Sequence, residues 1–271
     1  MKVAINGFGR IGRLTLRAFL ERKISDFDII AINDLGDVGS NLHLLKYDSV
    51  HGTLPFELTK NKDSVRIGNN NIQFFKEADP SMLPWEKLGI DIVIESTGVF
   101  TDREKASLHF KAGAKKILIS APANKPDLTV VYGINHNDIN HDHKIISNGS
   151  CTTNCLAPIA FLVDENVGIE SGYMTTVHSV TGDQNTIDTL HKDLRRARNS
   201  LISIIPTSTG AARAVGEVLP HLKGKIDGSA IRVPTPNVSL VDFKFYSKRD
   251  SSKDELQSIF KNAENQNFKS I

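Results

Sequence analysis

Short apolar runs alternate with longer amphipathic stretches through the first half of the chain. Four of these runs are predicted to be buried strands, at residues 2–6, 28–32, 91–95 and 116–120. The segments between them carry apolar residues at helical spacing, for example from an expected capping box at 101–104 to Gly113. Regular alternation of strand and helix is typical of a doubly wound parallel sheet. A short hairpin is expected at 65–75.

Beyond residue 150 the pattern changes. Helices are predicted at 156–162, 211–219 and after Ser252, and strands at 172–179, 226–233 and 238–246. The last two strands are expected in antiparallel order, and the polar segment 181–203 shows no clear period. We therefore predict a doubly wound α/β domain at 1–150. An α+β domain with a largely antiparallel sheet is predicted at 151–271.

Composition indicates an ordinary globular protein. The 39% hydrophobic and 24% charged residues exclude a disordered or fibrous chain. Net charge is +2 and the 33 basic residues are scattered, so neither nucleic acid nor membrane is expected as a partner. With no cleavable signal and two cysteines poorly placed to bridge, a reducing cytoplasm is the expected location. Three histidines at 135–143 are expected in a solvated loop rather than at a metal site.

A glycine motif follows the first strand and opens the first helix: Gly7-Phe8-Gly9-Arg10-Ile11-Gly12. There the first glycine permits a tight turn, the second lets a pyrophosphate approach the backbone, and the third lets the helix pack closely. Asp34 ends the second strand, where an acidic residue holds a ribose hydroxyl. Thr97 and Ser120 follow the carboxyl ends of two further strands, where ligands bind such sheets. The sequence predicts a dinucleotide site, although glycines also mark purely structural turns.

A cysteine motif, Ser147-Asn148-Gly149-Ser150-Cys151-Thr152-Thr153-Asn154-Cys155, leads into a helical pattern. Cys151 falls at or near the helix start, where unpaired N–H groups and the positive dipole end favour a thiolate. Thiolates attack carbonyls, so Cys151 is the candidate nucleophile; Cys155 is interpreted as a small buried cysteine. His178 ends a predicted strand and is either the base that pairs with the thiolate or a structural histidine.

Groups suited to an anion come downstream, at Thr181, Arg195, Arg196, Thr209, Gly210 and Arg232. Glycine and threonine before a helix offer backbone N–H groups and a hydroxyl, and arginine offers a charged fork. The basic run 192–198 has a second interpretation, as a solvated or subunit-contact face. A dinucleotide, a thiolate, a base and anion sites together indicate oxidation of a phosphorylated aldehyde through a thioester.

Four motifs together resemble glyceraldehyde-3-phosphate dehydrogenase, and the likeness covers the whole chain. They are Asn6-Gly-Phe-Gly-Arg-Ile-Gly-Arg13, the cysteine motif, His191-Lys-Asp-Leu-Arg-Arg-Ala-Arg198 and Arg232-Val-Pro-Thr-Pro-Asn237. The resemblance implies a Rossmann-type NAD-binding domain, a catalytic domain and, usually, a homotetramer joined through 181–203. It also implies phosphorylating oxidation of D-glyceraldehyde 3-phosphate to 1,3-bisphosphoglycerate in glycolysis.

The resemblance further implies roles for single residues. Cys151 would add to the aldehyde, and His178 would take the proton as hydride leaves. Thr181 and Arg232 would hold the substrate phosphate. The attacking phosphate would meet Ser150, Thr152, Thr209 and Gly210, and Arg196 is counted among these phosphate residues. NAD would contact Arg10, Ile11, Asp34 and Ser120.

Departures from the family concern the cofactor and the length. Ala78 stands where the family has an arginine near the adenosine, and Thr189-Leu190 replaces a Leu-Pro pair typical of NAD-specific members. Asp34 still repels a 2′-phosphate by like charge, so NAD is favoured and NADP stays open. The chain stops well short of a typical member, so its second domain is expected to be C-terminally incomplete.

Two other functions stay open on the sequence alone. Erythrose-4-phosphate dehydrogenase shares the cysteine and histidine chemistry. Against it, Ser208-Thr-Gly-Ala-Ala212 keeps the phosphate-site loop of the phosphorylating enzyme. From a different class comes a truncated chain that binds dinucleotide without catalysis.

Overall fold

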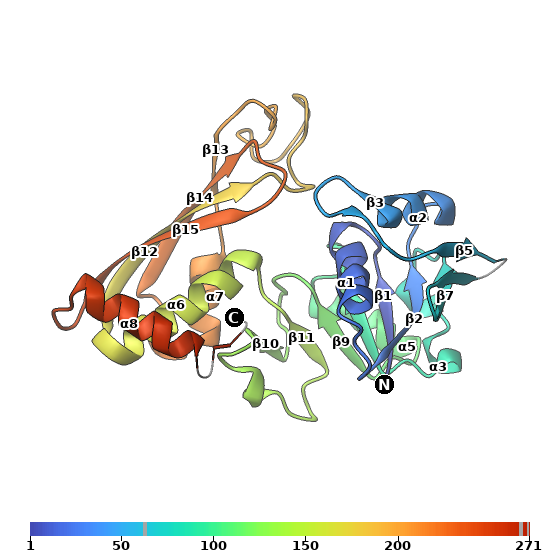
Figure 1. Cartoon of the computed structure of the whole chain (residues 1–271), viewed down its shortest axis with the longest axis horizontal. Helices are drawn as coiled ribbons and strands as arrows, with labels where there is room; N and C mark the ends of the chain where they lie inside the picture. Colours follow the sequence, from blue (N-terminus) through green and yellow to red (C-terminus); the bar gives the residue numbers. More distant parts are fainter. Residues whose placement is uncertain (62–63, 266–267, 270) are drawn as a thin grey trace. The chain divides into compact units, whose positions relative to one another are not determined.

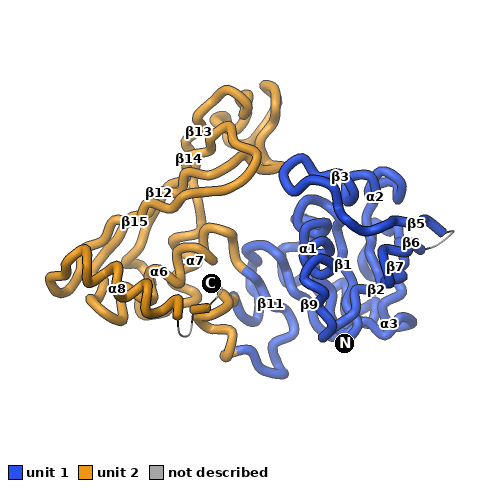
Figure 2. Tube along the Cα trace, in the orientation of Figure 1, with its two compact units in different colours: residues 1–129, 139–148 blue, residues 130–138, 149–271 orange. Residues whose placement is uncertain are grey.

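A computed structural model of the chain describes residues 1–61, 64–265, 268–269 and 271. Two compact units are visible in Figure 2, and each is described here by itself. Unit 1 comprises Met1–Thr129 and Ile139–Asn148, and unit 2 comprises Val130–Asp138 and Gly149–Ile271. Figure 1 shows the elements of both. Within the described ranges, no helix combines the length and apolar character that a membrane span requires.

The described strands of unit 1 form a nine-stranded sheet in the order β10-β11-β9-β8-β1-β2-β7-β6-β5. Their bounds are β1 Lys2–Asn6, β2 Asp28–Asn33, β5 Leu58–Lys60, β6 Ser64–Ile67, β7 Asn70–Phe75, β8 Ile92–Glu95, β9 Lys116–Ile119, β10 Leu128–Thr129 and β11 Ile145–Ser147. Pairing is parallel from β10 to β7 and antiparallel from β7 to β5. The predicted doubly wound parallel sheet is confirmed. The expected hairpin is β6–β7, and its second strand joins the main sheet.

The order of the sheet reverses at β1, which has β2 on one side and β8 on the other. Val3, Ala4 and Ile5 of β1 are all buried, as befits a central strand covered on both faces. Helix α1 (Arg10–Glu21) presses Leu16 and Phe19 onto one of these faces. A reversal of this kind opens a crevice at the carboxyl ends of the strands, and the glycine motif lies there.

The remaining elements of unit 1 are short. They are α2 Val38–Lys46, α3 Trp85–Leu88, α4 Arg103–Ala106, α5 Leu108–Lys111, the 3-10 turn Pro80–Met82 and a ribbon of β3 Tyr47–Asp48 with β4 Gly52–Thr53. The expected capping box at 101–104 is wrong by one residue, since Asp102 caps α4 by accepting from the Glu104 N–H at 2.9 Å. Asn124 Nδ2 donates to the same Asp102 carboxylate at 2.7 Å, which holds it in the capping position.

Unit 2 contains a four-stranded sheet in the order β13-β14-β12-β15, with helices beside it. The bounds are β12 Ile169–Ser179, β13 Ile205–Ser208, β14 Ile226–Val233, β15 Ser239–Ser247, α6 Cys151–Val167, α7 Ala211–Val218, α8 Lys253–Glu264 and the 3-10 turns His136–Asp138 and Pro220–Leu222. Two of the three pairings are antiparallel, which confirms a largely antiparallel sheet. The strands β14 and β15 run in opposite directions, as expected, because β12 lies between them and pairs parallel with β14 and antiparallel with β15.

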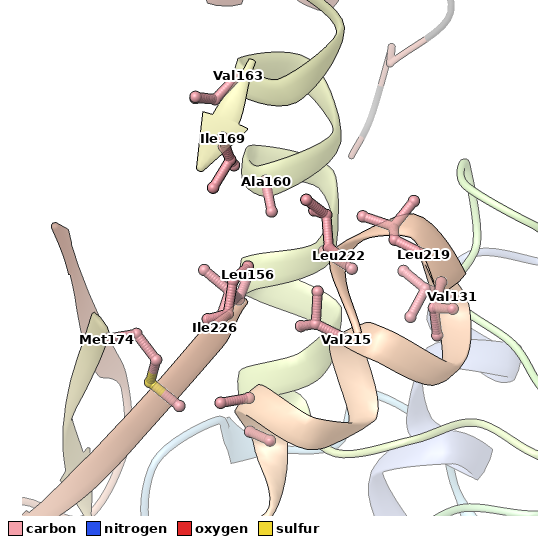
Figure 3. Packing of buried hydrophobic residues seen from close by; sticks show 14 of the residues in the cluster. Val131, Leu156, Ala160, Val163, Ile169, Met174, Val215, Leu219, Leu222 and Ile226 are labelled. Carbon is pink, nitrogen blue, oxygen red and sulfur yellow. The ribbon is translucent and has the colours of Figure 1, made fainter. Parts of the chain in front are cut away.

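The core of unit 2 lies between α6, α7 and the sheet. Figure 3 shows Leu156 and Ala160 of α6 facing Val215 of α7, with Met174 of β12 and Ile226 of β14 nearby. Two residues of α8, Leu256 and Phe260, pack against the same cluster. The polar segment 181–203 contains neither helix nor strand. The packed elements therefore fix the start of α6 and the end of β12, where the candidate chemistry lies.

Candidate active site

Two of the three glycines in the motif after β1 are required by packing. Gly7 has φ +90°, and a Cβ there would lie 2.5 Å from the backbone nitrogen of Thr97. A Cβ on Gly12 would lie 2.2 Å from the carbonyl oxygen of Gly7. Neither distance is possible for a real side chain, so these glycines let β1, β8 and α1 approach one another.

The middle glycine is different, because the described fold does not require it. Gly9 caps α1 in an extended conformation with φ −69°. A Cβ built there would meet no described atom within 4 Å. Its place at the start of a twelve-residue helix leaves the backbone N–H groups open to an anion, as a pyrophosphate needs. The residues present therefore fit a dinucleotide.

A cleft with a volume of about 400 Å³ lies over this motif. It is lined by Asn6, Gly7, Gly9, Asn33, Asp34, Leu35, Glu77, Ala78, Ser96, Thr97, Val99 and Phe100. One Asp34 oxygen accepts from the Phe8 N–H, and the other accepts from the Gly36 N–H, both at 2.8 Å. Burial acts to raise the pKa of Asp34, but these hydrogen bonds outweigh it and hold the pKa below its ordinary value. An ionised carboxylate therefore borders the cleft.

The predicted cofactor residues divide into two groups. Gly7, Gly9, Asp34 and Thr97 line the cleft, and so does Ala78, the residue that replaces the family's arginine. The other four have different surroundings. Arg10 pairs with Asp48 at 2.7 Å, Ile11 is half exposed, Gly12 packs under Gly7, and Ser120 Oγ donates to the Glu95 carbonyl at 3.1 Å.

In unit 2, Cys151 is the first residue of α6, as its sequence pattern predicted. Ser150 caps the helix, since its Oγ accepts from the Thr153 N–H at 3.0 Å. Asn154 Nδ2 donates to the Ser150 carbonyl at 2.9 Å and so braces the same turn. The Cys151 side chain is exposed at the positive end of a seventeen-residue helix, where a thiolate is favoured over a thiol.

Cys151 and His178 form a close pair. Cys151 Sγ lies 3.1 Å from His178 Nε2, and His178 is the buried penultimate residue of β12. Hydrogen bonding to His178 lowers the pKa of Cys151, against the opposing effect of partial burial. The same hydrogen bond raises the pKa of His178. Both shifts favour a thiolate beside an imidazolium.

Arg232 completes a positive centre around His178. It lies opposite His178 in the register of β14 with β12, and its Nη1 contacts His178 Nδ1 and donates to the Ser179 carbonyl at 3.1 Å. Burial, followed by repulsion from Arg196, lowers the pKa of Arg232. Arg232 Nε is buried without a hydrogen-bond partner among the described residues. A half-buried guanidinium whose Nε donor is buried and unused is suited to an anion.

The other predicted anion residues have protein partners. Thr181 hydrogen-bonds Gln184 Oε1 through both its backbone N–H at 2.8 Å and its hydroxyl at 3.0 Å. Arg196 pairs with Asp183, and its Nε donates to Thr207 Oγ1 at 2.8 Å. Arg195 instead pairs with Asp193 at 2.9 Å, and the Thr207 hydroxyl donates to the same carboxylate at 3.4 Å. Thr209 Oγ1 accepts from the Ala211 N–H at 3.2 Å, and Gly210 caps α7; Thr152 is buried.

Sequence reasoning missed several of these partners. Asp183 and Gln184 lie in the unpatterned polar segment, where nothing distinguishes a paired residue from a solvated one. Thr207 belongs to β13, which the sequence did not reveal. The interpretation of Cys155 as buried is wrong. Its side chain is exposed, although nearby atoms exclude enough water to raise its pKa, with a further contribution from Cys151.

A dinucleotide cleft in unit 1 and a histidine-paired thiol in unit 2 are features typical of an NAD-linked oxidoreductase. Residues 1–103 match the glyceraldehyde 3-phosphate dehydrogenase NAD binding domain, and residues 150–271 match the C-terminal domain of the same family. The chain therefore belongs to the glyceraldehyde 3-phosphate dehydrogenase family and is an NAD-dependent oxidoreductase.

Curated relatives agree with this assignment. The chain is 55% identical to glyceraldehyde-3-phosphate dehydrogenase of Xanthobacter flavus over 271 residues, which cover all of this chain and 81% of that protein. It is 57% identical to the Zymomonas mobilis protein of that name, over 97% of this chain and 78% of the relative. A third, from Cereibacter sphaeroides, is 52% identical over 97% of this chain. The chain thus spans about four fifths of these relatives.

Proposed function

We propose that the chain catalyses the phosphorylating oxidation of D-glyceraldehyde 3-phosphate to 1,3-bisphosphoglycerate, as the names of its relatives suggest. The observation that carries the proposal is the 3.1 Å contact between Cys151 Sγ and His178 Nε2 at the start of α6. The pathway is glycolysis and the location is the cytoplasm, where the two free cysteines suit a reducing medium.

The proposed chemistry begins at sulfur. The Cys151 thiolate attacks the aldehyde carbon, and His178 Nε2 gives its proton to the carbonyl oxygen, which yields a thiohemiacetal. His178 takes that proton back as the carbon loses hydride, and a thioester remains on Cys151. NAD, when bound, supplies the hydride acceptor. Inorganic phosphate then attacks the thioester carbon, and the thiolate leaves with acyl phosphate as the product.

Anion binding is assigned to the positive groups near this pair. Arg232, with its unused Nε, and Thr181 hold the substrate phosphate. The attacking phosphate is received by the hydroxyl and backbone groups of Ser150, Thr152, Thr209 and Gly210, together with Arg196. Because Asp183 already pairs with Arg196, an incoming phosphate competes with that carboxylate for the guanidinium.

Cofactor binding is assigned to the cleft of unit 1. Residues 1–150 act as the NAD-binding domain and residues 151–271 as the catalytic domain. Gly9 and the start of α1 receive the pyrophosphate, while Gly7, Gly12, Arg10, Ile11, Thr97 and Ser120 shape or contact the rest of the dinucleotide. Asp34, whose lowered pKa keeps it ionised, accepts the ribose hydroxyls and repels a 2′-phosphate, so NAD is preferred over NADP.

Replacement of the nucleophile tests the proposal. Cys151→Ser is expected to abolish formation of NADH from glyceraldehyde 3-phosphate while the Kd for NAD, from calorimetry, changes by less than about twofold, because Cys151 is not needed by the cleft of unit 1. The matched control is Cys155→Ser, which removes the other cysteine of the same helix and is expected to keep turnover. Turnover that survives in Cys151→Ser would refute the covalent mechanism.

Substrate assays separate the alternatives. Strict dependence of the initial rate on inorganic phosphate, with a higher kcat/KM for glyceraldehyde 3-phosphate than for erythrose 4-phosphate, supports the proposed activity. The opposite preference would assign the erythrose 4-phosphate reaction instead. Stoichiometric alkylation of Cys151 without any turnover would indicate a chain that binds dinucleotide only.

A further inference from the structure

A buried carboxylate lies beneath the dinucleotide cleft, and the proposed chemistry does not use it. Glu95 ends β8, and its side chain is wholly buried. One oxygen, Oε1, accepts from the Thr97 N–H at 2.8 Å and also from the Thr97 hydroxyl. The other, Oε2, accepts from Asn6 Nδ2 at 2.6 Å and lies 3.0 Å from His109 Nε2. Four hydrogen-bonding groups therefore converge on one carboxylate.

The protonation of His109 follows from its other neighbour. Trp85 Nε1 lies 3.0 Å from His109 Nδ1, and an indole N–H can only donate. His109 Nδ1 must therefore accept and carry no proton, which leaves the proton on Nε2, directed at Glu95. Three of the four partners of Glu95, the Thr97 N–H, Asn6 Nδ2 and His109 Nε2, can therefore only donate, so Glu95 is the acceptor on which the network ends.

A second branch of hydrogen bonds leads to the same carboxylate from β2. The Glu77 backbone N–H donates to Asn33 Oδ1 at 2.9 Å, which fixes the orientation of the Asn33 amide. Asn33 Nδ2 then donates to Asn6 Oδ1 at 2.7 Å, and Asn6 Nδ2 donates to Glu95. Each branch starts from a group that can only donate, so every bond runs towards Glu95 and the network has one consistent arrangement.

Four members of this network also line the cleft: Asn6, Asn33, Glu77 and Thr97. They come from β1, from β2, from the segment after β7 and from the segment after β8. We propose that Glu95 is a positioning residue of the dinucleotide cleft, because it is the shared acceptor that holds these wall segments in register. The inference rests on NAD being bound in this cleft.

A glutamine at position 95 cannot serve the same network. Its amide offers one oxygen and one NH₂ group, whereas each Glu95 oxygen faces two donors. Facing Asn6 and His109, the NH₂ group meets two groups that can only donate; facing Thr97, it meets the backbone N–H, which can only donate, and a hydroxyl that must turn from donor to acceptor. If the NH₂ group faces Thr97, the segment after β8 loses its backbone hydrogen bond to position 95. If it faces Asn6 and His109, the segments of β1 and β2 lose theirs. The lost hydrogen bonds therefore disturb the segments that line the cleft, although Glu95 itself lies beneath it.

Dinucleotide affinity measures this effect. In the full chain, Glu95→Gln is expected to raise the Kd for NAD by roughly tenfold, the scale set by a buried donor left unpaired. Asp91→Asn is the matched control, because it removes a carboxylate that precedes the same strand and pairs with exposed Lys115. It is expected to change the Kd by less than about twofold. Equal Kd values for Glu95→Gln and the unsubstituted chain would overturn the proposal.

Combined substitutions at Thr97 and Glu95 distinguish a positioning role of Glu95 from a general loss of stability. Thr97→Val removes the hydroxyl bond to Glu95 and is expected to raise the Kd for NAD. In the Thr97→Val background, adding Glu95→Gln is expected to raise the Kd by less than about threefold, since one of the two donors at Oε1 is already gone. Full additivity of the two effects would overturn the proposal. If Glu95→Gln is too unstable to purify, a Kd for Thr97→Val equal to that of the unsubstituted chain would overturn it.

The unsubstituted chain is titrated first. Failure of that chain to bind NAD would overturn both the cleft and the part played by Glu95. Unchanged turnover with unchanged affinity in Glu95→Gln would overturn the inference alone and leave the proposed reaction standing.

Discussion

At the scale of single residues, the proposed chemistry depends on three charged groups: the Cys151 thiolate, the His178 imidazolium and the Arg232 guanidinium. An imidazolium at His178 is stabilised on one side by the Cys151 sulfur at 3.1 Å and on the other by the Ser179 carbonyl at 2.8 Å from Nδ1. Arg232 opposes it, because its guanidinium shares that carbonyl and lowers the pKa of His178. The net shifts still raise the pKa of His178 and lower that of Cys151. The thiolate is thus the resting form over a wider pH range than in a free cysteine.

Removal of the imidazole should reverse this shift. In His178→Asn the largest cause of the lowered Cys151 pKa is gone, while partial burial, which raises the pKa, remains. Because only the thiolate is alkylated, the pH profile of reaction with iodoacetamide is expected to move to higher pH. Reaction rates followed by intact mass across the pH range give the profile.

The control for this measurement is the second cysteine. Cys155 has a raised pKa and reacts later, so the comparison is made in a Cys155→Ser background where only Cys151 is labelled. A profile that stays in place when His178 is replaced would show that the helix start, rather than the histidine, ionises the thiol.

The role of a residue could be predicted from the sequence only where its neighbours along the chain determine that role. Cys151 at a helix start follows from the cysteine motif, because a cap residue and the apolar helical spacing are adjacent in the sequence. The partners of Arg196 could not be predicted, because Asp183 and Thr207 come from separate segments that only the folded chain brings together. The convergence of Asn6 and His109 on Glu95 has the same long-range origin.

At the scale of elements, the turn from β1 into α1 contains two glycines, Gly9 and Gly12, with different surroundings. A Cβ on Gly12 would collide with the Gly7 carbonyl, and one on Gly9 would meet no described atom. Gly12→Ala is therefore expected to displace α1 and cost roughly 1–3 kcal/mol of unfolding free energy. Gly9→Ala is expected to leave stability within about 0.5 kcal/mol yet weaken NAD binding by roughly tenfold or more, since its methyl group occupies the path of the pyrophosphate.

Thermal unfolding without cofactor and calorimetric titration with NAD distinguish the two glycines. Each variant is the other's control, because both add one methyl group to the same turn. A stability loss in Gly9→Ala as large as that of Gly12→Ala would mean that the turn is tighter than described. Undiminished NAD affinity in Gly9→Ala would remove the dinucleotide from this turn.

Elements with a clear period were predictable, and those defined by partners were not. The strands β1, β2, β8 and β9 are apolar runs next to helical patterns, so their existence follows from the sequence. The short strands β10 and β11 of the same sheet were not predicted. Strand β13 was missed because Pro206 reads as a turn, yet a proline is tolerated there since β13 is an edge strand. The placement of β12 between β14 and β15 could not be foreseen either, because consecutive strands are neighbours by default.

At the scale of the whole molecule, the segment 181–203 presents apolar side chains that the described chain does not cover. Leu190 is 99% exposed, Leu194 is 80% exposed and Ile202 is 81% exposed. Scattered exposed leucines are ordinary, but several within one irregular segment indicate a surface that another chain buries. The proposal of a homotetramer joined through this segment accounts for them.

Self-association tests this proposal through a charge placed in the segment. Leu194→Asp puts a carboxylate where an interface would bury a leucine, and a buried unpaired charge costs far more than the lost apolar contact. Light scattering during gel filtration is expected to show tetramers for the unsubstituted protein and smaller species for Leu194→Asp. Met82→Asp is the control, because Met82 is 71% exposed on unit 1, and it should leave the mass unchanged. An unsubstituted protein that elutes as a monomer, or a Leu194→Asp variant that keeps the tetramer mass, would refute an interface at this segment.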